Sequence, residues 1–494
     1  MNFLSLFVLI PALMMLGLWV SRNMNQIRVV MVAGASALLA LSVGLVFLYL
    51  GEREAGNTAE MLFTDSRVWY APLNIHYAIG VDGISVMMLL LSAIIVFTGV
   101  FASWRMQPLT KEFFLWFCLL SIGVFGFFIS LDLFTMFMFY EVALIPMYLL
   151  IGVWGSGKKE YSAMKLTLML MGGSALILMG ILGIYFGAGA TTMNIVELAN
   201  LHIPVEMQRI FFPLAFVGFG ILGALFPFHT WSPDGHASAP TSVSMLHAGV
   251  LMKLGGYGCF RIAIYLMPQA AQEQAWIFLI LTAIGVVYGA FSACVQKDLK
   301  YINAYSSVSH CSLVLFAILM MTQTASTGAV LQMLSHGLMT ALFFALIGMI
   351  YGRTHTRDIR EMSGLMKVMP FLSVCYVIAG LANLGLPGLS GFVAEMTIFV
   401  GAFEVNETFN RTLTIIATTS IVVTAVYILR LVGKILYGKV ENQEHLKLTD
   451  ATWDERFTLI CLIVAIAGLG MAPWGISDII NDSVLPVINQ LAKG

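Results

Sequence analysis

The chain has 494 residues, of which 59% are hydrophobic and only 10% are charged, with a mean hydropathy of +0.90 and a net charge of −1. Soluble domains carry about 25% charged residues, so this composition excludes a water-soluble protein, and the near-neutral charge excludes a basic surface for nucleic acid. We predict an all-α polytopic membrane protein, because a helix satisfies its own backbone hydrogen bonds in lipid.

Fourteen stretches are apolar enough to predict membrane-spanning helices, which need about 20 residues each. The first has no basic segment before its apolar run and contains Pro11, which favours a span over a signal peptide. In chain order the predicted spans are residues 3–20, 29–50, 82–101, 113–130, 132–152, 164–188, 210–228, 239–266, 276–294, 302–321, 329–351, 369–403, 412–437 and 457–474.

Two predicted spans carry signals for a broken helix. The seventh ends at Pro227, and the twelfth is interrupted by Leu386-Pro387-Gly388. Each is the fourth span in a set of five, and broken helices in corresponding positions are typical of transporters built from inverted repeats. We therefore predict a three-helix segment at 1–112, two inverted five-helix repeats at 113–266 and 276–438, and a loop with a last helix at 439–494.

The distribution of lysine and arginine predicts how the chain is oriented. With the N-terminus outside, the loops on the cytoplasmic side hold 17 of these residues, and the external loops and C-terminus hold 5. Cytoplasmic loops carry the excess of positive charge in membrane proteins. This pattern favours fourteen spans with both termini on the external side.

Three charged residues fall deep inside predicted spans: Glu141, Lys253 and Glu395. A charge at the centre of a bilayer costs at least about 3 kcal/mol, so such residues are usually paired and functional. Asp132 and Arg261 lie nearer to span ends, and we expect them to reach the interface. The alternative that the glutamates and the lysine only hold helices together stays open.

Histidines accompany these charges. His247, His310 and His336 lie within spans, and His229 and His236 flank the first break. Histidine titrates near neutral pH and can pass a proton on. A lone histidine is more often a hydrogen-bonded core residue, but several at similar depth beside Glu and Lys indicate a proton path.

Signatures of redox and nucleotide chemistry are absent from the sequence. There is no GxGxxG, Walker or CxxC motif, and the six cysteines occur singly. We predict that this chain carries no catalytic redox centre, no cofactor and no metal.

The segment Phe226-Pro227-Phe228-His229-Thr230-Trp231-Ser232-Pro233-Asp234-Gly235-His236 resembles the FPxHTWLPDAH signature of the antiporter-like subunits of respiratory complex I. Further segments resemble other motifs of that family, in the same order: residues 140–152, 298–310, 332–338, 355–358 and 386–395. Glu395 favours the M-type (chain 4) branch, since L-type and Mrp relatives usually carry lysine there.

The resemblance implies a non-redox, proton-translocating subunit in the membrane arm of an NADH–quinone oxidoreductase, in a bacterial inner membrane. It implies L-type, N-type and smaller membrane subunits as partners, with lipid around them and no nucleic acid. NADH, FMN, iron–sulfur clusters and quinone are expected in partner subunits. The implied path contains Glu141, Lys253, His310, His336 and Glu395, with His229, His247 and Lys300 as possible auxiliary residues.

One residue departs from the family pattern. The family carries a lysine in span seven, seven residues before the histidine of its signature, and here that position is Leu222. Glu141 therefore lacks its usual partner. We expect His247 or His229 to replace that partner, with His247 favoured, or the subunit to couple only weakly.

Two other functions remain open from the sequence. The chain could belong to a related cation/proton antiporter or membrane-bound hydrogenase complex, or it could be a weakly pumping structural subunit. The retained buried charges argue against a purely structural role, because idle charges in a membrane are costly.

Overall fold

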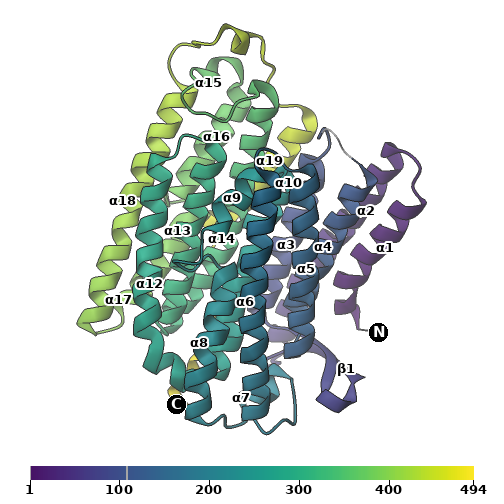
Figure 1. The fold of residues 1–494 in the computed structure, drawn as a ribbon, viewed down its shortest axis with the longest axis vertical. Helices are drawn as coiled ribbons and strands as arrows, with labels where there is room; N and C mark the ends of the chain where they lie inside the picture. The colour runs from purple at the N-terminus through teal and green to yellow at the C-terminus, as the bar shows by residue number, and fades with distance from the viewer. Residues whose placement is uncertain (1, 107–109, 494) are drawn as a thin grey trace.

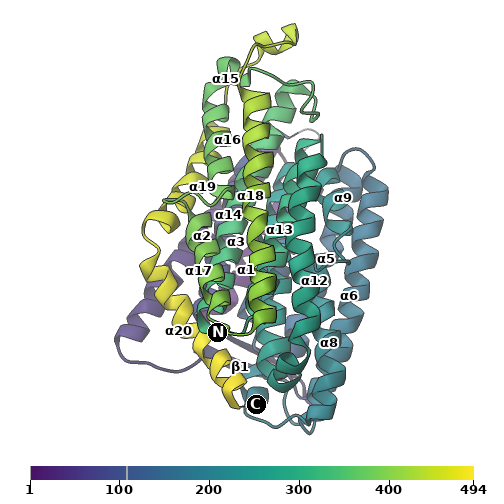
Figure 2. The same cartoon turned by 90° about the vertical axis from the view of Figure 1, so that its left-hand side faces the viewer.

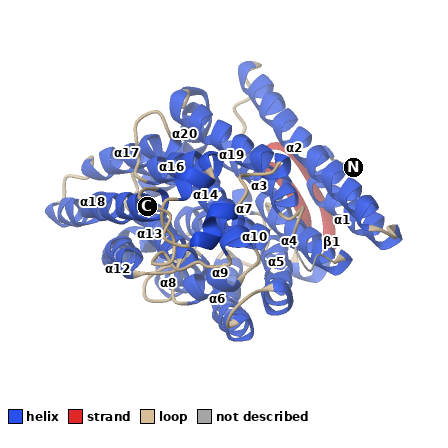
Figure 3. Cartoon of the chain, turned by 90° about the horizontal axis from the view of Figure 1, so that it is seen from above, coloured by secondary structure: helices blue, strands red, loops and turns tan. Residues whose placement is uncertain are grey.

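The structure is a computed structural model that describes residues 2–106 and 110–493. Long helices run side by side in one bundle, and both chain ends lie toward the same end of it (Figures 1 and 2). A view along the bundle shows α14 near its middle and α1 at its edge (Figure 3). Accordingly, the most apolar stretch of α14 is 94% buried and that of the first helix only 28%.

The N-terminal segment contains the only strands in the described part of the chain. β1 and β2 pair antiparallel in a hairpin whose turn has Asn74 in the left-handed region, at φ 52°. The sequence did not predict this hairpin, because a short hairpin between two spans leaves no long-range hydropathy signal, whereas the rest of the chain is mostly helical, as predicted. The elements are η1 (Phe3–Ser5), α1 (Leu6–Val20), α2 (Met24–Glu54), β1 (Leu62–Tyr70), η2 (Ala71–Leu73), β2 (Ile75–Val81) and α3 (Gly83–Ala102).

The next set of helices contains the first predicted break. α8 ends at Leu222, five residues before the predicted end at Pro227, and a short helix follows it. The elements are α4 (Lys111–Ile129), α5 (Leu133–Trp154), α6 (Lys159–Gly187), α7 (Ile195–Ala199), α8 (Val205–Leu222) and α9 (Trp231–Ser238). One further helix is divided by two π-helical turns into α10 (Thr241–Leu246), η3 (His247–Leu251), α11 (Met252–Gly258) and η4 (Cys259–Ile264).

The second set contains the second predicted break, between α16 and α17. Its elements are α12 (Pro268–Val295), α13 (Leu299–Leu319), α14 (Gln323–Thr354), α15 (Leu365–Val368), α16 (Pro370–Asn383), α17 (Ser390–Phe403) and α18 (Thr408–Leu436). The chain finishes with η5 (Gln443–Lys447), α19 (Trp453–Met471) and α20 (Trp474–Lys493). The sequence did not predict α20 as a helix, because its apolar residues form only one face.

Eleven described helices are long and apolar enough to span a membrane, or up to twelve if α19 and α20, bent by 74°, form one broken span. Three predicted spans lie outside the eleven. Residues 239–266 are divided by the π turns, residues 369–403 are split into α16 and α17, and residues 457–474 belong to the bent pair. The count of fourteen and the domain boundaries stay predictions.

α8 and α16 end in the same way. The N–H of Leu225 donates to Gly220 at 2.8 Å, and the N–H of Leu386 donates to Leu381 at 3.1 Å. The residue before each donor has a positive φ, 59° at Ala224 and 71° at Gly385. This six-residue bond closes a helix through a left-handed residue, so both breaks have one backbone design despite different sequences.

α5 and α13 also begin alike, each capped by an aspartate. Asp132 accepts the N–H groups of Phe134 and Thr135, and Asp298 accepts those of Lys300 and Tyr301. The Asp132 end lies beside β2, whereas the Asp298 end lies beside Arg357, which donates to Ala237 of α9. Figure 1 shows the strands and α9 at opposite ends of the bundle. Two inverted repeats require such an arrangement.

Candidate functional site

Lys253, at the second residue of α11, is buried in the middle of the bundle, with 2% of its surface exposed. Its Nζ donates to the carbonyl of Ala248 at 2.6 Å and lies 2.7 Å from Nδ1 of His336 on α14. The π turn η3 ends two residues before Lys253, and such turns are frequent at functional sites. Lys253 and His336 therefore form a direct hydrogen-bonded pair between two helices.

His310 on α13 continues this contact. Its ring stacks on that of His336 with centroids 5.2 Å apart, and its Nδ1 lies 3.4 Å from Oε1 of Glu395 on α17. Four titratable groups from four helices thus stand in one row: Lys253, His336, His310 and Glu395. We call this row the connected line.

Two amides hold His310 in place. Its Nε2 lies 2.5 Å from Oδ1 of Asn383, and Nε2 of Gln332 lies 3.0 Å from its Nδ1. With Nε2–H donating to Asn383, the neutral ring can accept at Nδ1 from Gln332. When protonated, the same Nδ1 donates toward Glu395. The amides therefore support both charge states of the ring.

Asn383 and Gln332 were not predicted as site residues, because neither carries a charge or an imidazole that would stand out within a span. Gln332 stands four residues before His336 on α14, a spacing that places both on one helix face, and this signal could have found it. Asn383 ends α16 at the break, which was also visible in the sequence. The hydroxyl of Ser306 contacts Asn383 at 3.1 Å and the hydroxyl of Tyr427 at 2.8 Å.

The end of the broken helix α8 packs against the helix that carries Lys253. A side chain at Gly255 would meet the backbone nitrogen of Gly223 at 2.4 Å, so the two backbones touch there. Gly223 and Lys253 also line a common cavity of about 10 Å³. Because the C-terminal end of a helix carries partial negative charge, α8 favours a positive charge on Lys253.

Glu141 on α5 is separate from this line. Its Oε1 is buried and has no hydrogen-bond partner among the described residues. Leu222 is fully buried in the apolar core. The structure therefore leaves the carboxylate of Glu141 without the cation that the family places in span seven.

The two expected substitute partners make other contacts. The His229 ring stacks on Phe226 at 5.5 Å, and the His247 ring lies 5.3 Å from Trp231 and 4.4 Å from His236. Within residues 2–106 and 110–493, no hydrogen bond or ion pair joins Glu141 to either histidine. A partnership of His247 or His229 with Glu141 stays a prediction.

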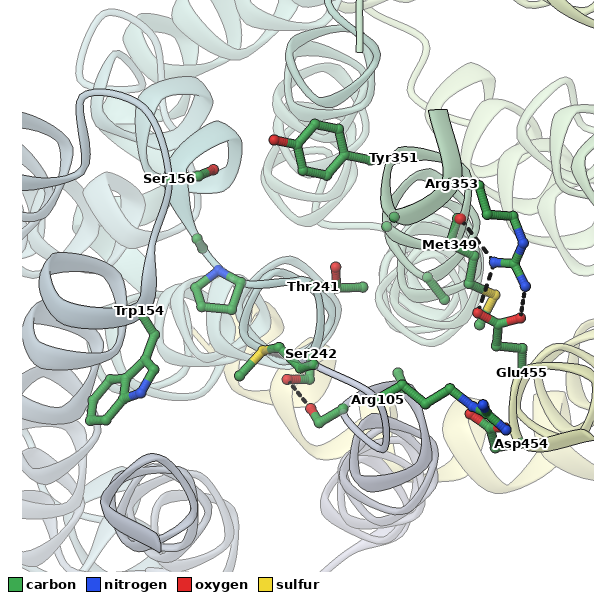
Figure 4. Close-up of a pocket in the computed structure, with 18 of the residues that line it drawn as sticks. Arg105, Trp154, Ser156, Thr241, Ser242, Met349, Tyr351, Arg353, Asp454 and Glu455 are labelled. Atoms are coloured by element: carbon green, nitrogen blue, oxygen red, sulfur yellow. Dashed lines mark hydrogen bonds and ion pairs between the residues drawn. The ribbon is translucent and has the colours of Figure 1, made fainter. Parts of the chain in front are cut away.

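A polar cavity of about 610 Å³ opens near the first residues of α10. Figure 4 shows ion pairs on one side of it, Arg105 with Asp454 and Arg353 with Glu455, joined at 3.1 and 2.5 Å. Lys300, the third auxiliary candidate, also lines it and donates to the carbonyl of Ala239 at 2.6 Å. The cavity is large enough to admit water, and Lys300 is the buried lysine in its lining.

Asp132 and Arg261, which we expected near the membrane interface, are both buried within the protein. Asp132 is 1% exposed because its carboxylate caps α5. Arg261 is also 1% exposed, and its guanidinium forms an ion pair with Asp82. Proximity to a span end is therefore a poor guide to exposure in this chain.

No cluster of three or more His, Cys, Asp or Glu side chains suited to a metal ion occurs in the part of the chain that the structure describes. The prediction that redox cofactors belong to partner subunits is not tested by this.

Comparisons with known proteins agree on the family. A profile described as "NADH:quinone oxidoreductase/Mrp antiporter, TM" matches residues 130–424. A protein of Rickettsia bellii (strain RML369-C) named NADH-quinone oxidoreductase subunit M is 34% identical over 471 residues, which are 95% of this chain and 93% of that protein.

Solved structures share the fold. A chain of "Respiratory complex I from Thermus thermophilus with bound NADH" matches with a TM-score of 0.90 and 25% identity, covering 99% of both chains. A chain of the "Structure of Mrp complex from Dietzia sp. DQ12-45-1b" matches with a TM-score of 0.84 and 18% identity, covering 99% of this chain and 100% of that one. The second match, at low identity, shows the fold alone.

Proposed function

This chain belongs to the NADH:quinone oxidoreductase/Mrp antiporter membrane family, and on that premise we propose that it is a non-redox, proton-translocating subunit of an NADH–quinone oxidoreductase. The observation that carries the proposal is the connected line of Lys253, His336, His310 and Glu395. Four buried titratable groups in a row are costly in a membrane protein unless they are used.

The connected line supports a stepwise transfer. A proton on Lys253 passes to His336 across the 2.7 Å contact, and then to the stacked ring of His310. From His310 it reaches Glu395 across 3.4 Å. Lys253–His336 and His310–Glu395 are direct contacts, and the step between the two stacked rings requires a bridging water or the rotation of a ring.

The driving force comes from outside this chain. Moving one proton against about 100 mV costs about 2.3 kcal/mol, and quinone reduction in partner subunits supplies it. Glu141, at the partly exposed face of α5, is the group through which a neighbouring membrane subunit changes the charge near Lys253. NADH, FMN, iron–sulfur clusters and quinone are bound by partners, in a bacterial inner membrane with both termini of this chain outside.

A second candidate is a weakly pumping subunit that mainly fills the membrane arm. The absence of lysine at Leu222 favours it, because Glu141 then has no span-seven cation to bind and release. The connected line favours the pump, since a filler needs none of its four groups.

Lys253→Met in the assembled complex separates the two candidates. In proteoliposomes, we expect the ratio of protons moved to electrons transferred to fall, while electron transfer still occurs. Lys434→Met removes an exposed lysine from α18 and serves as the matched control. An unchanged ratio in Lys253→Met, with assembly confirmed, contradicts the pump.

A further inference from the structure

A second row of buried polar groups starts near Lys253 and leads away from the connected line, and we call this row the file. Tyr257, Arg261 and Tyr265 follow Lys253 at intervals of four residues, a spacing that keeps side chains on one face of a helix. The guanidinium carbon of Arg261 lies 5.6 Å from the ring of Tyr257 and 6.0 Å from that of Tyr265. Arg261 therefore stands between the two tyrosines.

Residues from the N-terminal segment complete this file. The hydroxyl of Ser85 lies 2.9 Å from that of Tyr257, and Asp82 pairs with Arg261. At the far end, the hydroxyl of Tyr265 donates to Glu60 at 2.5 Å. Glu60 lies two residues before β1, so the file leads from the middle of the bundle toward the end that carries the strands (Figure 1).

A polar row of this kind could let a proton pump lose protons by leakage. A proton held on Lys253 must leave along the connected line, and a second hydrated route would let it escape without doing work. Tyrosine and serine hydroxyls both donate and accept hydrogen bonds, and with water they can pass a proton along. Arginine differs, because its guanidinium only donates and does not lose its proton in proteins.

We propose that the Arg261–Asp82 ion pair is an electrostatic seal that stops protons on Lys253 from leaking toward the hairpin end of the bundle. This role rests on the proposed function of Lys253. A fixed arginine is a barrier to protons and cations in a pore, and the guanidinium of Arg261 can accept no further proton. Asp82 holds that charge in place, because its other oxygen caps α3 through the N–H of Ser85 at 2.9 Å.

Two details support a seal over a purely structural pair. Nε and Nη1 of Arg261 are buried without a hydrogen-bond partner in residues 2–106 and 110–493. A pair built only for stability would satisfy these donors, whereas donors left free bind and orient the water of a passage. Arg261 also lies within the π turn η4, a distortion that is found mostly at functional sites.

The test is passive proton conductance in proteoliposomes that contain the assembled complex, with no electron donor or quinone. A potassium diffusion potential drives protons, and a trapped pH dye reports their flux. For Arg261→Met we expect the passive proton conductance to rise roughly tenfold. The eight helical residues between Lys253 and Arg261 span about 12 Å. One charge at that distance changes the proton occupancy of a site by about that factor at an effective dielectric near 20.

Three variants define the origin of the leak. Arg261→Lys keeps the charge and should stay at the level of the unchanged complex. Arg209→Met removes an exposed arginine at the start of α8 and should also leave the conductance unchanged. Arg261→Met combined with Lys253→Met should abolish the leak, because the proton then has no site from which to enter the file.

Unchanged conductance in Arg261→Met overturns the seal, as does a leak that persists without Lys253. If Arg261→Met does not assemble, Asp82→Asn with Arg261→Gln removes both charges but keeps hydrogen bonding, and it must leak for the seal to stand. The assay involves no turnover. Failure of the proposed function is seen separately, as intact pumping in Lys253→Met.

Discussion

The two predicted sets of helices share a helix break and an aspartate cap but differ in their polar connections. In the second set, His310, His336 and Glu395 form an uninterrupted row that begins at Lys253. In the first set, Glu141 stands apart with a buried oxygen that no described residue binds. The helix breaks and aspartate caps match between the sets, so the difference lies in side chains.

The comparison shows that a broken helix alone does not create a proton path, because polar side chains must also stand beside the break. α16 ends at Asn383, where the second break begins, and the amide of Asn383 contacts His310. α8 ends at Leu222, where the first break begins, and the side chain of Leu222 is apolar and fully buried. We therefore propose that the connected line transfers the proton, and that Glu141 in the first set responds to neighbouring subunits.

The largest effect is expected from cutting the connected line. His336→Leu removes the group between Lys253 and His310, and we expect this chain's share of proton translocation to be lost. His229→Leu is the matched control, because His229 stacks on Phe226 outside the line. The proton-to-electron ratio in proteoliposomes checks both variants, and equal losses in the two would erase the contrast between the sets.

A lysine at position 222 should give Glu141 a charged partner and so make the first set of helices more like the second. In Leu222→Lys we expect the new charge to be tolerated because Glu141 can pair with it. Adding Glu141→Gln should then lower stability, since removing one partner of a buried pair costs about 3–5 kcal/mol. Thermal unfolding of the purified complex, with Glu141→Gln alone as the control, measures this coupling. Additive effects would show that position 222 does not face Glu141.

A smaller effect is expected at the amide that orients His310. Asn383→Leu removes the acceptor for Nε2, and leaving a buried donor unpaired costs about 1–3 kcal/mol. We expect proton transfer to slow by roughly tenfold. Asn303→Leu is the control, because the one side-chain hydrogen bond of Asn303 to a described residue is a 3.5 Å contact with Thr340. Equal rates in the two variants would mean that Asn383 does not position the ring.

The smallest effect is expected from His247→Ala. Its ring lies against Trp231 and His236, so its loss should change the proton-to-electron ratio far less than the loss of His336. A fall in the proton-to-electron ratio as large as that in His336→Leu would support His247 as the substitute partner of Glu141. It would also mean that the first set of helices takes part in proton transfer.

Residues that are costly in lipid were the ones that the sequence revealed. Glu141, Lys253 and Glu395 stood out as charges, and the family motifs supplied His310 and His336. Gln332 and Asn383 did not stand out, because the value of an amide depends on a partner from another helix. The pairing of Arg261 with Asp82 was hidden for the same reason, since 179 residues separate them.

Backbone features were predicted unevenly. Proline and glycine marked both breaks, but the end of α8 depends on the left-handed residue Ala224, which no composition rule identifies. The hairpin and α20 lacked the continuous apolar signal on which span prediction relies. Local sequence therefore located most spans, while contacts between distant segments decided where helices stop.

Infrared difference spectroscopy of the carboxyl group of Glu395 during turnover tests the connected line most directly. We expect a protonation signal that disappears in Glu395→Gln and also in His336→Leu, because the proton reaches Glu395 through that ring. A signal that persists unchanged in His336→Leu would show that Glu395 receives its proton by another route, and the connected line would not be the path.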